Sequence, residues 1–341
     1  MICLEIGSGE LPLLMKHITA LGLFSGGLDS MLAVSLLRHQ GIAVTGLVWT
    51  TPFFGAERAL ESAAQLDLPL KVEDLTEKFL PLLRQPPHGF GRELNPCIDC
   101  HILMLREGGK IMTAAGYDFL FTGEVLGQRP FSQHKGALNL VARESGYADV
   151  LLRPLCARLL KPTRPELEGL VDRNQLLNLS GRGRKRQMAL AAQYGITNYP
   201  SPAGGCLLTN AGFAARLRDL LQHQPQISRR DLELLKWGRH FRLSPSTKLV
   251  VGRHQRDNEA IAALSQATDL CLRVSNFPGP LALIPNANSE ASVLKAAAIC
   301  TSYSDAPEEK PIPVIVEGPN GREVVMTRRQ PKQVFHELLI H

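Results

Sequence analysis

Apolar runs and helical stripes alternate along the first half of the chain. Residues 18–24 are apolar except for Thr19, and this run predicts a buried strand. A helix whose apolar positions recur every three to four residues begins near Leu28, and Gly41 ends it before a second strand over residues 42–48. Further elements are expected at residues 56–66 (helix), 70–74, 119–122 and 150–152 (strands). This alternation predicts an α/β fold with a doubly wound parallel sheet, whose sites lie at the carboxyl ends of its strands.

The pattern changes twice in the second half. From about residue 166 it becomes mostly helical and basic, and beyond residue 246 short strands and helices end in a hairpin that turns at residues 318–321. This tail predicts a separate, smaller α+β domain. We therefore expect a short N-terminal lead (1–20), an α/β catalytic domain (21–165), a basic helical extension (166–245) and the tail domain (246–341).

Length and composition agree with a globular protein of more than one domain. The chain has 341 residues, of which 44% are hydrophobic and 21% charged, which excludes collagen-like, disordered and coiled-coil classes. It has no run of about 18 apolar residues and no signal-peptide pattern, so we expect a cytoplasmic protein with no membrane partner. Seven cysteines then indicate thiols, metal ligands or redox chemistry rather than a disulfide framework.

The net charge of +6 is concentrated in one stretch. Residues 153–186 hold nine basic side chains against three acidic ones, which accounts for the whole excess. Within this stretch a Gly- and Arg-rich run precedes a helical pattern, and such a cluster favours contacts with RNA phosphates. A solvated basic turn is the alternative. The residues expected to bind RNA are Arg182, Arg184, Lys185 and Arg186.

The loop Ser25-Gly-Gly-Leu-Asp-Ser30 joins the first strand to the first helix. Glycines there allow the backbone to approach a phosphate, and the first N–H groups of the helix point at the anion. A tight strand-to-helix turn is the alternative. No lysine follows the glycines, so the loop is not the ordinary P-loop of GTPases and kinases.

This loop resembles the PP-loop of the ATP pyrophosphatase superfamily, whose signature SGGxDS it matches in full. The resemblance implies cleavage of ATP between its α and β phosphates, with Asp29 holding the pyrophosphate through Mg²⁺. Trp49 and Thr50, after the second strand, occupy the place where the family binds adenine, although both also suit an ordinary strand end. The residues implied to bind Mg-ATP are Ser25, Gly26, Gly27, Leu28, Asp29 and Ser30.

Three cysteines stand in loop contexts rich in Pro and Gly. Cys97 and Cys100 form a CxxC spacing that lets two thiolates reach one metal ion or cluster, or lets one thiol resolve a persulfide on the other, and Cys206 follows Gly-Gly in a later loop. Three thiolates on a [4Fe–4S] cluster leave one iron open for a sulfide, which would suit sulfur transfer. Zinc or an idle pair is the alternative. The remaining cysteines lie in apolar runs and are expected in the core: Cys3, Cys156, Cys271 and Cys300.

The segment Phe121–Gln133, which contains Thr-Gly-Glu-Val-Leu-Gly-Gln, and the Leu-Arg-Pro-Leu of residues 152–155 resemble the catalytic domain of the tRNA 4-thiouridine synthases of the ThiI type. The Asn-Pro-Cys at residues 95–97 is also similar to the tRNA 2-thiouridylases, and together the match covers about residues 20–210. We expect Gly123 and Glu124, at a strand end within this segment, to contact the nucleotide, with a supporting role as the alternative for Glu124.

The tail resembles the RNA-binding domain of NFACT ribosome-quality-control proteins. The resemblance rests on Val251-Gly-Arg253, on Phe277-Pro-Gly279 and on the alanine run 296–298. It implies that Arg253 contacts RNA, although the same arginine would also suit a role in bracing the fold.

Taken together, these features predict an ATP-dependent tRNA sulfurtransferase that makes 4-thiouridine in preference to 2-thiouridine. Its cofactors would be ATP, Mg²⁺ and a [4Fe–4S] cluster, and its partners tRNA and a sulfur donor, either inorganic sulfide or a cysteine desulfurase. Two alternatives stay open: a PP-loop ligase that transfers nitrogen to RNA, and a non-catalytic adaptor that binds RNA or the ribosome. The sequence leaves the oligomeric state open, a dimer included.

Overall fold

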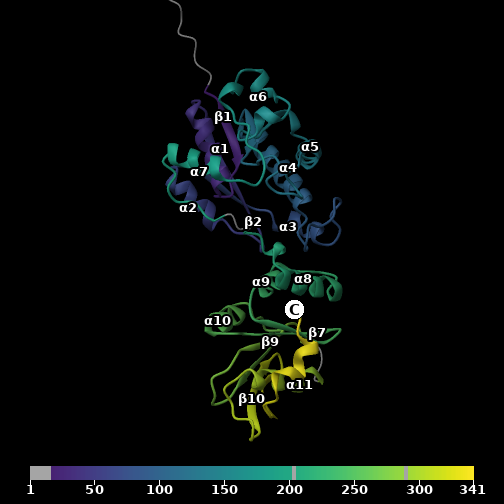
Figure 1. Cartoon of the computed structure of the whole chain (residues 1–341). Helices are drawn as coiled ribbons and strands as arrows, with labels where there is room; N and C mark the ends of the chain where they lie inside the picture. Colours follow the sequence, from purple (N-terminus) through teal and green to yellow (C-terminus); the bar gives the residue numbers. More distant parts are fainter. Residues whose placement is uncertain (1–16, 202–204, 288–290) are drawn as a thin grey trace, which may run out of the picture. The chain divides into compact units, whose positions relative to one another are not determined.

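The computed structural model describes residues 17–201, 205–287 and 291–341. Most of the expected N-terminal lead, Cys3 included, therefore lies outside the described residues. The chain divides into two compact units (Figure 1). The first comprises Met1–Thr50, Gly55–Lys78 and Cys97–Ala203, and the second comprises Thr51–Phe54, Phe79–Pro96 and Gly204–His341.

The first unit is built on a five-stranded sheet with the strand order β3-β2-β1-β4-β5. All four strand pairs are parallel, which confirms the predicted α/β class. Every residue of β4 is buried, as expected for a strand covered on both faces. The strands are β1 (Thr19–Leu23), β2 (Ala43–Thr50), β3 (Leu70–Asp74), β4 (Phe119–Thr122) and β5 (Leu151–Leu152).

Helices follow the strands of this unit in the predicted alternation. Helix α1 buries the apolar side chains that recur from Leu28, and Gly41, with a φ of +77°, turns the chain away after its end. Helix α4 packs against β1 and β4, and α7 packs against α1. The helices are α1 (Leu28–His39), α2 (Glu57–Gln65), α3 (Thr76–Phe79), α4 (Cys97–Ala115), α5 (Lys135–Ser145), α6 (Arg164–Leu167) and α7 (Lys185–Gln193).

The strand order places a switch point between β1 and β4. The chain proceeds from β1 to one side of the sheet and later returns to β4 on the other side, with Leu23 in register with Thr122. Loops that leave the carboxyl ends of such neighbouring strands diverge and open a crevice, where α/β proteins of this type bind ligands. Here those loops contain residues 24–27 and 123–134, which are the segments that the sequence singled out.

The second unit contains a six-stranded antiparallel sheet with the order β11-β10-β8-β9-β7-β6. It confirms the predicted second domain and its hairpin, in which Gly318 pairs with Gly321. The sheet begins before the boundary expected at residue 246, because β6 pairs with β7. The strands are β6 (Arg239–Ser244), β7 (Thr247–Val251), β8 (Leu270–Val274), β9 (Ala282–Ile284), β10 (Ile312–Gly318) and β11 (Gly321–Thr327).

Helix α11 supplies the core of this unit. Its residues Ala296, Ala297 and Ile299 are fully buried and pack in one cluster with Phe241 and Leu272 of the sheet. The expected extension 166–245 is divided between the units, since α7 belongs to the first and the next helices to the second. The helices of the second unit are α8 (Ala211–His223), α9 (Arg229–Leu234), α10 (Gln255–Ala263) and α11 (Ala291–Ser302).

Across the described part of the chain, no helix combines the length and the apolar character that spanning a membrane requires.

Candidate active site

The loop after β1 needs glycine for two reasons. Gly26 has a φ of +72°, in the left-handed region that favours glycine. A Cβ at this position would also lie 2.3 Å from the carbonyl oxygen of Arg58 in α2. On the same helix, the hydroxyl of Ser62 donates a hydrogen bond of 2.8 Å to the Gly26 carbonyl. Helix α2 therefore holds the loop in one conformation.

Helix α1 begins without a side-chain cap. Gly27 is its N-cap residue, and the hydroxyl of Ser30 donates to the Gly27 carbonyl at 2.8 Å instead of accepting from the helix. The first N–H groups of the helix thus keep their capacity to bind an acceptor, and the positive end of the helix dipole lies with them. This is the arrangement that binds a phosphate group.

Gly123 brings the end of β4 against this helix start. A Cβ on Gly123 would lie 2.6 Å from the backbone nitrogen of Ser30 and 2.7 Å from the carbonyl oxygen of Asp29. Close packing against the phosphate loop therefore requires glycine at this position. The Gly123 backbone lies at the edge of the crevice.

Asp29 has one carboxylate oxygen bound and one without a partner. The side-chain amide of Gln128 donates to Oδ2 at 2.9 Å, whereas Oδ1 is buried and has no hydrogen-bond partner. Burial raises the pKa of Asp29, although the Gln128 hydrogen bond and the charge of Arg184 act to lower it. A divalent cation would supply both a partner for Oδ1 and a positive charge next to the buried carboxylate. Asp29 therefore fits the magnesium site that the resemblance implies.

Trp49 and Thr50 lie at the carboxyl end of β2. The hydroxyl of Thr50 donates to the carbonyl oxygen of Glu73 in β3 at 3.3 Å, so its hydrogen is used within the sheet. Trp49 is buried, and its indole Nε1 has no hydrogen-bond partner. Of the two, only Trp49 keeps an unused donor.

Glu124 is the centre of a buried polar network. Arg153 donates to Oε2 at 2.8 Å and Thr122 to the same oxygen at 3.0 Å, while His101 Nδ1 lies 3.0 Å from Oε1. Burial by itself would raise the pKa of Glu124, but the Arg153 and His101 contacts hold it well below its ordinary range. Both oxygens of Glu124 are bound by protein groups. This carboxylate therefore connects its own Thr-Gly-Glu segment to the Leu-Arg-Pro-Leu segment through Arg153 and to helix α4 through His101.

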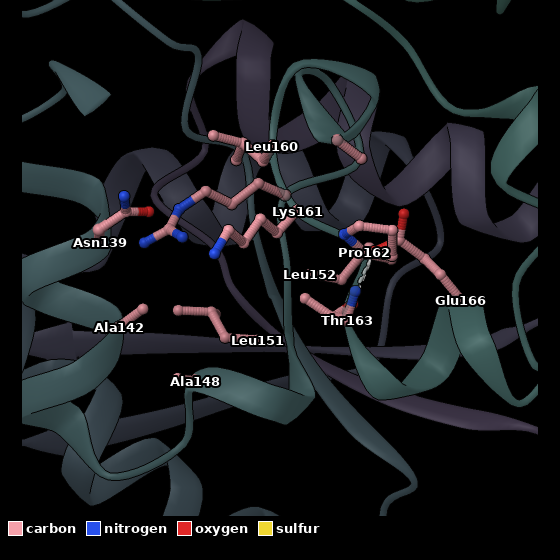
Figure 2. A pocket seen from close by; sticks show the side chains of 12 residues that line it. Asn139, Ala142, Ala148, Leu151, Leu152, Leu160, Lys161, Pro162, Thr163 and Glu166 are labelled. Atoms are coloured by element: carbon pink, nitrogen blue, oxygen red, sulfur yellow. Dashed lines mark hydrogen bonds between the residues drawn. The ribbon is translucent and has the colours of Figure 1, made fainter. Parts of the chain in front are cut away.

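A pocket of about 190 Å³ lies beside β5 (Figure 2). Arg153 lines it and links it to the Glu124 network through its Nε. A second guanidinium nitrogen of Arg153 donates to the carbonyl of Leu138 at 3.1 Å. In Figure 2 the side chains of Lys161 and Asn139 reach toward the same space. The pocket therefore combines an apolar floor with nitrogen donors.

Cys97 and Cys100 occupy the first turn of α4 and are both partly buried. The spacing of three residues places them on one side of the helix. Cys206 lies in the second unit, where it is the N-cap residue of a short 3₁₀ helix. Among the residues that the structure describes, no three His, Cys, Asp or Glu side chains converge as the ligands of a metal ion would.

The other cysteines have structural positions. Cys156 and Cys300 are completely buried, and burial raises the pKa of their thiols to about 11 and about 12. Cys271 is partly buried, and its pKa is also raised by burial. Such thiols stay protonated and are poor nucleophiles. Their expected placement in the core is confirmed for Cys156 and Cys300, and Cys271 packs at the edge of a core cluster.

The four basic residues before and at the start of α7 differ in exposure. Arg182, Lys185 and Arg186 are exposed, whereas Arg184 is partly buried and its Nε has no hydrogen-bond partner. Arg182, Lys185 and Arg186 are thus available to a large anionic partner.

Arg253 braces the second unit. Its Nε donates to Oδ2 of the fully buried Asp257 at 2.6 Å, and one terminal nitrogen lies 3.2 Å from Oδ1. Asn258 acts similarly, because its Oδ1 accepts from Leu281 N at 2.9 Å. The Arg253 side chain is nevertheless 43% exposed, so part of it remains accessible to solvent.

The expected site residues omitted two glutamines that the structure brings to Asp29. Gln128 stands inside the Thr-Gly-Glu-Val-Leu-Gly-Gln segment, so its motif was the available signal. Gln187 is buried in α7 and acts to lower the pKa of Asp29. Nothing in the local pattern marks Gln187, because a polar residue in a basic helix is ordinarily exposed.

Comparison with known proteins gives separate matches for the two halves of the chain. Residues 238–337 match the family model described as the NFACT protein RNA binding domain. A tRNA-specific 2-thiouridylase MnmA from Syntrophotalea carbinolica is 37% identical over 126 residues, which are 32% of this chain and 34% of that protein. A tRNA sulfurtransferase from Desulfurococcus amylolyticus is 31% identical over 160 residues, 44% of this chain and 32% of that protein.

The chain spans about a third of the length of these two relatives. A solved structure of a 4-thiouridine synthetase in complex with RNA and bound ATP is 18% identical, with a TM-score of 0.34, and the match covers 52% of this chain and 51% of that one. The matches to tRNA-thiolating proteins and to the NFACT domain confirm the two resemblances that the sequence motifs carried.

Proposed function

We propose that this protein is an ATP-dependent tRNA sulfurtransferase that makes thiouridine, with 4-thiouridine favoured over 2-thiouridine. The observation that carries the proposal is the phosphate loop at the switch point of the sheet, where an uncapped helix start meets the unpartnered Oδ1 of Asp29. The similarity to a tRNA sulfurtransferase and to a tRNA 2-thiouridylase supports thiolation of tRNA as the activity.

In the proposed reaction, residues 25–30 bind the phosphates of ATP, and Trp49 lies where the adenine would bind. Magnesium, held by Asp29, would neutralise charge on the phosphates. A uridine carbonyl oxygen attacks the α-phosphorus and forms an O–P bond, while the bond to the bridging oxygen breaks and pyrophosphate leaves with its electron pair. The adenylated oxygen then becomes part of AMP, a good leaving group.

Sulfur replaces that leaving group in the second step. Sulfide sulfur attacks the activated carbon, a C–S bond forms, and the C–O bond to AMP breaks. If a cysteine persulfide attacks instead, the second thiol of the CxxC pair then cleaves the remaining S–S bond, which leaves a disulfide that an external thiol reduces. We assign sulfur handling to Cys97, Cys100 and Cys206, because these cysteines lie outside the buried cores that hold Cys156 and Cys300. In the described residues these thiols do not converge as the ligands of a [4Fe–4S] cluster would, so the cluster is proposed only as one of two ways to carry the sulfur, the other being a cysteine persulfide.

We assign RNA binding to the exposed arginines and lysine that precede and begin α7 and to the second unit. The match of residues 238–337 to an RNA-binding domain supports this role, and the Arg253 side chain is partly exposed there. The first unit would then carry the nucleotide chemistry together with the exposed basic residues at α7, and the second would contribute Cys206 and a further RNA-binding surface.

Mass spectrometry of nucleosides tests the proposal. The full chain is incubated without oxygen with unmodified tRNA, ATP, Mg²⁺ and sulfide, and the tRNA is digested. A thiouridine in this digest and its absence with Asp29→Asn are expected, together with pyrophosphate release that requires tRNA. Pyrophosphate release without thiouridine would support the nitrogen-transfer alternative, and no release at all would support the adaptor.

A further inference from the structure

The basic segment before α7 lies beside the phosphate loop. The backbone N–H of Gly181 donates to the carbonyl of Leu126 at 2.8 Å, and Ser180 forms a parallel bridge with the same residue. Two residues further on, Gln128 donates to Asp29. One short loop therefore connects the basic segment to the residue proposed to hold magnesium.

Helix α7 continues this contact. It packs against α1, which begins in the phosphate loop, and its Gln187 is buried. Arg184 is the N-cap residue of α7 and precedes Gln187 by three residues, so the two lie within one turn. The charge of Arg184 acts to lower the pKa of Asp29, in agreement with the packing of α7 on α1.

Arg184 also has unused hydrogen-bonding capacity. Its Nε is buried and has no acceptor, and its guanidinium carbon lies 6.0 Å from the centre of the Tyr199 ring. A buried donor without an acceptor is unfavourable unless a ligand supplies one. Arginine is the side chain best suited to bind phosphate oxygens with several donors at once.

We propose that Arg184 binds a phosphate group of the nucleotide held by residues 25–30, and that it is separated in function from its exposed neighbours Arg182, Lys185 and Arg186. The proposal rests on the proposed function and adds to it a residue that neutralises the pyrophosphate as the bond to the α-phosphorus breaks. The basic run thus serves two anions: its partly buried member faces ATP and its exposed members face RNA.

Equilibrium binding of α,β-methylene-ATP with Mg²⁺, in the absence of tRNA, tests the proposal. Arg184→Gln should weaken this binding by about 10- to 100-fold, because charge-assisted hydrogen bonds are lost, while Arg184→Lys should recover part of the affinity. Arg182→Gln is the matched control and should bind the analogue as the unchanged chain does. Adenosine, which has no phosphate, should bind equally to all four proteins.

Equal affinity of Arg184→Gln and the unchanged chain for the analogue would overturn the proposal and leave the proposed function intact. An equal loss of adenosine binding would also overturn it, since that result indicates a structural role. Failure of the unchanged chain to bind the analogue would instead contradict the proposed function and this inference with it.

Discussion

Arg153 donates a hydrogen bond of 2.8 Å to the carboxylate of Glu124, and both side chains are almost completely buried. This contact joins the Leu-Arg-Pro-Leu segment to the Thr-Gly-Glu segment, and His101 adds the helix that begins with Cys97 and Cys100. A buried ion pair contributes little net stability, yet the loss of one partner leaves an uncompensated charge. The pair therefore fixes the relative positions of three motifs around the candidate site.

Removal of this charge should destabilise the first unit. We expect Glu124→Gln to lower the free energy of unfolding by about 3 kcal/mol, because Arg153 keeps its buried charge without a counterion. Denaturant unfolding measures the change. Glu144→Gln is the control, since it breaks an exposed pair with Arg143 and should cost less than about 0.5 kcal/mol. Equal effects of the two substitutions would show that the buried pair is dispensable.

The same pair predicts an acid-dependent loss of stability. The pKa of Glu124 in the folded chain lies below its ordinary value of 4.5, so the unfolded chain binds more protons as the pH falls below that value. The stabilisation is fully present above pH 4.5 and is lost progressively at lower pH. We expect the free energies of unfolding of the unchanged chain and of Glu124→Gln, measured from about pH 6 to about pH 3, to approach each other as the pH falls. A difference between the two that does not change with pH would contradict the prediction.

Gly123 should tolerate no side chain. An added Cβ would press on Ser30 N and Asp29 O, and the backbone atoms there cannot rotate away. We expect Gly123→Ala to cost about 1–3 kcal/mol and to weaken binding of Mg-ATP. Gly183→Ala, where a Cβ would meet nothing within 4 Å, is the control. Retained nucleotide affinity in Gly123→Ala would mean that the phosphate loop can shift without loss of function.

The three assigned cysteines should affect sulfur transfer and leave nucleotide binding intact. Single substitutions Cys97→Ser, Cys100→Ser and Cys206→Ser should each abolish thiouridine formation while Mg-ATP still binds. Cys271→Ser, at a partly buried thiol of raised pKa, should stay active. Iron and sulfide analysis of the anaerobically purified chain separates a cluster from a persulfide route. A triple Cys→Ser variant that still forms thiouridine would contradict the assignment of these cysteines. Unchanged tRNA-dependent pyrophosphate release in that variant, with no thiouridine from the unchanged chain either, would favour nitrogen transfer.

The exposed members of the basic segment should govern tRNA affinity. Replacement of Arg182, Lys185 and Arg186 with Gln should weaken tRNA binding and reduce the slope of its salt dependence by about one for each phosphate that the variant no longer binds. Binding of α,β-methylene-ATP should not change. Arg143→Gln, an exposed arginine outside the segment, is the matched control. An unchanged tRNA affinity and salt slope would assign the segment to a solvated surface.

Much of the fold followed from local patterns. Strands β3 and β4 have the predicted limits. For β4 the reason is local, because an apolar run that is buried on both faces leaves little choice of limits, whereas β3 is mostly exposed and pairs with β2. The phosphate loop could also be predicted from the sequence, since its glycines and hydroxyl residues lie within one short segment.

Long-range pairings became visible only in the folded chain. A motif does not reveal that Glu124 has both oxygens engaged, that Gln187 reaches Asp29, or that the basic run is divided between a partly buried arginine and exposed neighbours. The reason is physical: periodicity records which side of an element is apolar, whereas the partner of a buried polar group depends on which elements the chain later packs against it. Local sequence patterns were enough to predict the α/β architecture and the residue types of the site, whereas the packing of α2, α4 and α7 around the sheet determines which of those residues meet.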